Sequence, residues 1–177
     1  MKFKHVLLPL SIIALGCSAA KGNDFNILDF GATADTAKLS TSAINKAIDA
    51  CFKAGGGKVI IPNGNFKSGT ITLLDNVELF LERGAVLYGS TDHRDYPRQK
   101  QPAYRSQKDP GGWYALIYAE GVSNIGISGF GTINGQGDKQ LPRPVPKGAI
   151  NEDRDGRPRN ILFICCRKIS LEGITML

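Results

Sequence analysis

The sequence has few of the residues that build metal centres and disulfide frameworks. Only His5 and His93 are histidines among 177 residues, and four cysteines show neither disulfide nor zinc-site spacing. We therefore predict no metal centre and no cofactor, with Cys51, Cys165 and Cys166 behaving as small, buried or half-buried apolar residues. Since Cys165 and Cys166 are adjacent in a run predicted to be extended, their side chains should point to opposite faces.

The apolar run at the N-terminus is too short to cross a bilayer. It extends from Val6 to Leu15 and follows Lys2 and Lys4, which is typical of a secretory signal peptide. We assign residues 1–20 to this signal and residues 21–177 to a single domain.

Two processing routes remain open after the signal. Ala14-Leu15-Gly16-Cys17 resembles a lipoprotein box, which favours Cys17 as a lipid anchor, although alanine replaces the usual larger aliphatic residue. Alternatively, Ser18-Ala19-Ala20 is a small-x-small cleavage site for soluble export. Either route predicts an exported protein, as a bacterial outer-membrane or periplasmic lipoprotein or as a secreted protein.

Helical periodicity is confined to one segment. Between Ala43 and Ala54, apolar residues recur at i, i+3, i+4 and i+7, and Gly55-Gly56-Gly57 ends the pattern. No helix separates the strands expected after it, which disfavours an alternating βαβ fold. These strands are Lys58–Ile61, Ile71–Leu74, Val77–Leu81 and Ala85–Tyr88.

What the sequence does have is a repeat of alternating apolar residues followed by glycine. Its copies start at Val77, Ile125 and Ile169, 48 and 44 positions apart, which predicts about two coils of ~20–25 residues between copies. The fold class is therefore all-β, a parallel β-solenoid with an N-terminal capping helix. We expect the stack to be truncated at the C-terminal end, leaving an open coil available for self-association.

Two long polar segments, Ser90–Trp113 and Gly137–Arg159, interrupt the repeat. Such insertions build the binding face of many solenoids, but they are as often solvated excursions. His93 beside Asp92 has the composition of an acid/base pair, yet a lone loop histidine is more often a solvated side chain.

Several segments resemble the polygalacturonase-type pectin hydrolases, glycoside hydrolase family 28 of the pectin-lyase-like β-helix superfamily. They are Phe30-Gly31-Ala32, Ala43–Ala50, Ala54–Gly64, Gly69–Leu73, Gly89-Ser90, Ile127–Gly137, Arg159–Phe163 and Ile169–Met176. The resemblance covers nearly all of the chain from Phe25 and is to the N-terminal portion of these enzymes. It implies a right-handed parallel β-helix that hydrolyses galacturonosyl bonds in pectic polysaccharide with inversion, using carboxyl groups ~6.5–9.5 Å apart.

The catalytic signature of that family is missing. The sequence contains no Asp-Asp pair and no Asn-Thr-Asp triplet, and His93 has no flanking glycines. We therefore assign no catalytic residue, and the resemblance leaves open whether this chain is itself an enzyme. We expect it to be inactive alone; the alternative is a non-catalytic β-solenoid that binds polysaccharide or another chain.

Three residues are candidates for binding the pectic chain that the resemblance implies. Arg154 and Arg157 have guanidinium groups suited to uronate carboxylates, and Trp113 could stack on a sugar ring. The competing interpretations are a self-neutralised, solvated charge run for the arginines and packing for the aromatic pair Trp113-Tyr114. The formal net charge of +6 suits an acidic polymer but equally suits solubility, and no nucleic acid partner is predicted.

Overall fold

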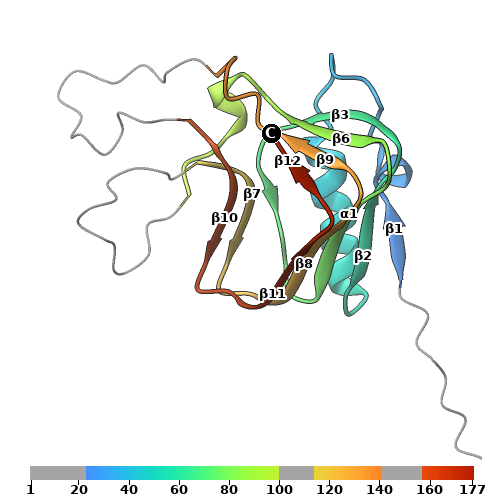
Figure 1. Cartoon of the computed structure of the whole chain (residues 1–177). Helices are drawn as coiled ribbons and strands as arrows, with labels where there is room; N and C mark the ends of the chain where they lie inside the picture. Colours follow the sequence, from blue (N-terminus) through green and yellow to red (C-terminus); the bar gives the residue numbers. More distant parts are fainter. Residues whose placement is uncertain (1–22, 100–113, 141–156) are drawn as a thin grey trace, which may run out of the picture.

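The computed structural model describes residues 23–99, 114–140 and 157–177. In these ranges three parallel β-sheets, here named A, B and C, surround one apolar interior (Figure 1). Sheet A contains β1 (Asp24–Asn26), β2 (Gly57–Ile61), β5 (Val77–Leu81), β8 (Ser123–Gly129) and β11 (Arg167–Glu172). Sheet B contains β3 (Gly64–Ser68), β6 (Ala85–Gly89), β9 (Thr132–Asn134) and β12 (Thr175–Met176). Sheet C contains β4 (Ile71–Thr72), β7 (Ala115–Glu120) and β10 (Arg159–Ile164). From β2 onward the chain visits the sheets in the order A, B, C, so one visit to each makes one coil of a parallel β-helix.

The predicted solenoid is confirmed, but the predicted number of coils is wrong. The first and second copies of the repeat are adjacent strands, because Leu79 of β5 lies in register with Ile127 of β8. Ile125 of β8 is in turn opposite Ile169 of β11. Each interval of the repeat is therefore one coil lengthened by an insertion, and not two coils.

The interior is built from ladders of apolar side chains, one from each coil. Val59, Leu79 and Ile127 are neighbours in sheet A and are completely buried. Leu171 continues this ladder on β11, where it is 48% exposed because no further strand of sheet A is described beyond it. The alternation of apolar and polar residues thus directs every second side chain into the stack.

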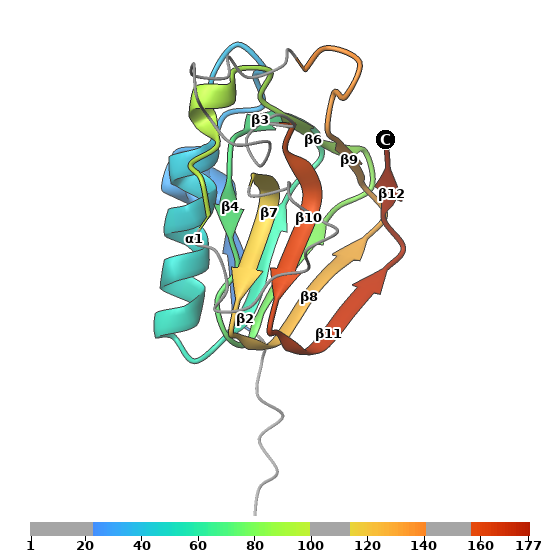
Figure 2. The same ribbon diagram turned by 90° about the vertical axis from the view of Figure 1, so that its left-hand side faces the viewer.

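The predicted capping helix is confirmed as α1, Thr41–Lys53, at the opposite end of the stack from β11 (Figure 2). Its apolar stripe includes Ile44, Ile48 and Cys51, all buried against the first coil. The Asn45 side chain donates to the carbonyl of Thr70 at 3.0 Å and accepts from the amide of Thr72 at 2.9 Å. The helix therefore covers the interior and also hydrogen-bonds the free side of β4.

Besides α1, the described ranges contain 3₁₀ turns at Ile27–Phe30 and His93–Asp95. None of the helices in the described ranges is long and apolar enough to span a membrane. The signal peptide predicted for residues 1–20 lies outside those ranges.

The extended conformation predicted for Cys165 is wrong. Cys165 has a φ of +54° in the turn between β10 and β11, and Gly121 has +68° in the turn between β7 and β8. These two turns from sheet C to sheet A thus place a left-handed residue at the same position, a conformation that glycine adopts without steric cost. Cys165 is exposed and Cys166 is half-buried, so only Cys51 of the three is fully buried. Burial raises the pKa of the Cys51 thiol to about 11.

Candidate functional site

Both insertions leave the stack at the same corner. The first separates β6 from β7 and the second separates β9 from β10, which is the turn from sheet B to sheet C in successive coils. Strands β6 and β9 are hydrogen-bonded neighbours, with Tyr88 opposite Asn134. The beginnings of the two insertions are therefore close together, as expected for insertions that form one face of a solenoid.

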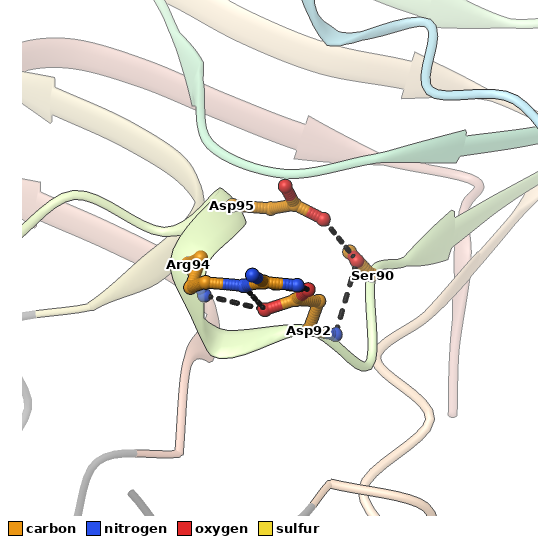
Figure 3. A network of polar contacts seen from close by, with 4 residues as sticks. All are labelled: Ser90, Asp92, Arg94 and Asp95. Atoms are coloured by element: carbon orange, nitrogen blue, oxygen red, sulfur yellow. Dashed lines mark hydrogen bonds and ion pairs between the residues drawn. The ribbon is translucent and has the colours of Figure 1, made fainter.

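The first insertion begins with a compact polar turn, shown in Figure 3. The Ser90 hydroxyl donates to the carboxylate of Asp95 and accepts from the amide of Asp92 at 3.1 Å. The Asp92 carboxylate accepts from the amide and the guanidinium group of Arg94, at 2.9 and 3.0 Å. These hydrogen bonds from Arg94 hold the pKa of Asp92 well below its usual range.

Hydrogen bonds join the beginnings of the two insertions. The Gln140 side chain donates to the carbonyl of Ser90 at 2.7 Å, and that of Gln136 donates to the carbonyl of Gly89 at 2.6 Å. Tyr96 donates its hydroxyl to the same Ser90 carbonyl at 2.8 Å, and burial of its ring raises its pKa. We name Ser90, Asp92, Asp95, Tyr96, Gln136 and Gln140 the loop-base cluster.

The loop-base cluster joins the beginnings of the two insertions, within the part of the chain that the structure describes. Asp92 is engaged by Arg94 and Asp95 by Ser90, so each carboxylate already has a partner. The sequence made His93 and Asp92 candidates for an acid/base pair. In the structure, however, the Asp92 carboxylate is hydrogen-bonded to Arg94. The contacts of the cluster position the described beginnings of the two insertions relative to each other.

The neighbouring sheet C carries a single carboxylate on its strands, Glu120 at the end of β7. Tyr118 donates its hydroxyl to Glu120 at 2.7 Å, and burial raises the pKa of Tyr118. Glycoside hydrolysis by inversion requires two carboxyl groups with a water molecule between them. The strands of sheet C therefore carry no such pair.

Most of the predicted binding residues lie outside the described ranges. Cys17, Trp113 and Arg154 are among them. Arg157 is exposed two residues before the start of β10. Tyr114, which follows Trp113, is 8% exposed and accepts from the amide of Arg159 at 2.8 Å through its carbonyl. Packing is thus the role of Tyr114, while the predictions for Trp113, Arg154 and Arg157 remain predictions.

Comparison with known proteins gives consistent relatives. The chain is 40% identical over 121 residues to an exo-poly-α-D-galacturonosidase of Dickeya chrysanthemi, covering 65% of this chain and 20% of that protein. It is 32% identical over 140 residues to a protein of Vitis vinifera named a probable polygalacturonase, covering 75% of this chain and 28% of that protein. The structure of the family 28 exopolygalacturonase of Yersinia enterocolitica superposes with a TM-score of 0.69 at 28% identity, covering 89% of this chain and 35% of that one.

Other relatives act on a different acidic polysaccharide. A mannuronan C5-epimerase of Azotobacter vinelandii is 32% identical over 124 residues, covering 65% of this chain and 11% of that protein. No family model matches the chain. The chain spans between about a tenth and just over a quarter of the length of these curated relatives.

Proposed function

The chain belongs to the polygalacturonase-type glycoside hydrolases of family 28, with their right-handed parallel β-helix, and from this premise we propose that it forms part of a hydrolase acting on pectic polysaccharide. The observation that carries the proposal is the identity to two galacturonan-degrading proteins along most of the chain. The superposition with a family 28 exopolygalacturonase supports the same substrate class. The bond to be hydrolysed is a galacturonosyl bond, with inversion.

Two features support a role without catalysis for the 177-residue chain itself. The sequence contains no Asp-Asp pair and no Asn-Thr-Asp triplet, and the strands of sheet C carry one carboxylate. The alternative function, a β-solenoid that binds polysaccharide without cleaving it, is favoured by the same features.

Affinity electrophoresis of residues 21–177 tests the substrate class. We expect retardation in gels containing polygalacturonate and little in gels containing alginate or a neutral glucan. Stronger retardation in alginate would contradict the pectic assignment and favour the chemistry of the epimerase relatives. A parallel assay should find no release of reducing ends from polygalacturonate beyond that of a heat-treated sample, which separates binding from hydrolysis.

Export of the protein is also part of the proposal, through the basic and apolar N-terminus and Cys17. In a bacterial host, labelled palmitate should be incorporated into the chain and lost in Cys17→Ser. Incorporation that persists in this variant would rule out Cys17 as the anchor, and soluble export without label would favour the second processing route.

Self-association should occur through the end of the stack formed by β10, β11 and β12. Each of these strands is the terminal strand of its sheet in the described structure, and Ile169 and Leu171 are about half exposed on the ladder face. Because unpaired edges and apolar ladders template pairing with another chain, residues 21–177 should sediment as oligomers.

A matched pair of variants locates this contact. Leu171→Lys should increase the monomer fraction severalfold in sedimentation velocity. Leu28→Lys replaces a leucine of similar exposure, 46% against 48%, near the capped end and should leave the distribution unchanged. A monodisperse, stable monomer for the unmodified chain would refute the prediction.

A further inference from the structure

A polar hollow of about 430 Å³ lies on the outer face of sheet B, beside the beginnings of the two insertions. Its volume is within the range of small-molecule binding sites, roughly 300–1,000 Å³. It is lined by Thr36, Asn65, Lys67, Tyr88, Thr91, Gln136 and Lys139.

The pleat of the strands explains why these side chains gather. Phe66 and Leu87 point into the core and are completely buried, so Lys67 and Tyr88, the next residues along β3 and β6, point outward. Lys67 and Tyr88 are opposite each other in the parallel register. An ammonium group and a phenol ring are thus side by side at the floor of the hollow.

The surrounding backbone is held by hydrogen bonds. The amide of Ser40 donates to the carbonyl of Lys67 at 2.8 Å, which joins the segment carrying Thr36 to β3. On the other side, the Gln136 side chain donates to the carbonyl of Gly89 at 2.6 Å and accepts weakly from Lys139 at 3.4 Å. The walls of the hollow are therefore positioned before any ligand arrives.

The charge of the hollow has one sign. Lys67 and Lys139 line it, and no aspartate or glutamate does. The ion pairs of the described ranges, which involve Lys53, Lys58 and Arg94, include neither lysine. By contrast, the hollow on the outer face of sheet A contains Lys58 together with its partner Glu78. The sheet B hollow thus offers two cationic donors in a concave, polar surface.

We propose that this hollow binds a short stretch of uronate oligosaccharide. The two ammonium groups would pair with sugar carboxylates, the amides and hydroxyls of Asn65, Gln136 and Thr91 would bond sugar hydroxyls, and the Tyr88 ring would contact a sugar face. The identification of the uronate as galacturonate rests on the proposed function. Such a site would hold the polymer on the side of the stack next to the insertions.

Calorimetric titration with trigalacturonate tests this site. We expect the exported chain to bind it, and Lys67→Met/Lys139→Met to weaken binding at least about tenfold, since charge-assisted hydrogen bonds are lost. Lys46→Met/Lys53→Met removes the same charge from helix α1 and should leave the affinity unchanged. The methyl-esterified trimer should bind the unmodified protein as weakly as trigalacturonate binds the double variant of the hollow.

The outcomes separate the hollow from the proposed function. If the unmodified chain and Lys67→Met/Lys139→Met bound trigalacturonate with equal affinity, the site would be overturned while the pectic assignment stayed intact. If Lys46→Met/Lys53→Met weakened binding to the same extent, the effect would be one of net charge and the site would again be overturned. Lysine-dependent binding of an alginate trimer, without binding of trigalacturonate, would keep the hollow as a uronate site and overturn the pectic function. Failure to bind any uronate trimer would overturn the hollow.

Discussion

Replacing Leu79 by alanine should lower the free energy of unfolding by about 3–4 kcal/mol. Leu79 is completely buried on β5, between Val59 of the preceding coil and Ile127 of the following one. Its side chain therefore belongs to two coil interfaces, and its removal leaves a cavity that the fixed spacing of the strands cannot close. Urea denaturation followed by circular dichroism at low protein concentration measures the loss.

The neighbouring residue provides the control. Phe80 points to the outer face of sheet A, where its ring lies 4.9 Å from the ammonium nitrogen of Lys58. Phe80→Ala removes a larger side chain, but should cost only about 1 kcal/mol, because the ring is half-buried and its cation–π contact is exposed. Equal losses in the two variants would show that β5 does not present Leu79 to the core.

Gly129→Ala should destabilise the protein by roughly 2–4 kcal/mol, through the backbone and not through a cavity. Gly129 has a φ of +111°, and a Cβ atom placed on it would lie 2.0 Å from the carbonyl oxygen of Leu81. That carbonyl accepts from the amide of Phe130 at 2.9 Å, so it cannot move away without loss of a bond between coils. Thermal unfolding of the variant should show a markedly lower midpoint.

Gly137→Ala is the matched control for this substitution. Gly137 has no heavy atom within 4 Å of an added Cβ and no left-handed φ. Its midpoint should stay close to that of the unmodified protein, or rise slightly because alanine restricts the unfolded chain. If Gly129→Ala behaved in the same way, the close approach of β8 to Leu81 would be refuted.

The fold could be predicted from local patterns because the solenoid repeats them. Alternation in Val77–Leu81 identified β5 at its exact bounds, and the apolar stripe identified α1 within two residues at either end. The number of coils could not be read in this way. The first coil is 20 residues long, from Gly57 to its partner Val77, so intervals of 48 and 44 resembled two coils. The pairing of β5 with β8 and of β8 with β11 shows that the residues in excess of one 20-residue coil belong to the insertions.

The polar sites depended on contacts between distant residues. Gln140 and Ser90 are 50 positions apart, and the residues around them in the sequence give no sign that they form a hydrogen bond. The outward positions of Lys67 and Tyr88 follow from alternation, but their meeting with Lys139 requires the stacking of coils. The residues that attracted attention in the sequence were instead the charged members of the insertions, such as Arg154 and Arg157.

The buried thiol of Cys51 can report whether helix α1 covers the end of the stack. With a pKa of about 11 and no exposed surface, this sulfur should resist alkylation at neutral pH for as long as α1 stays docked. Cys165, exposed in its turn, should be modified at once. The delay between the first and the last modified cysteine, followed by mass spectrometry, would therefore time how often the helix lifts from the end of the stack.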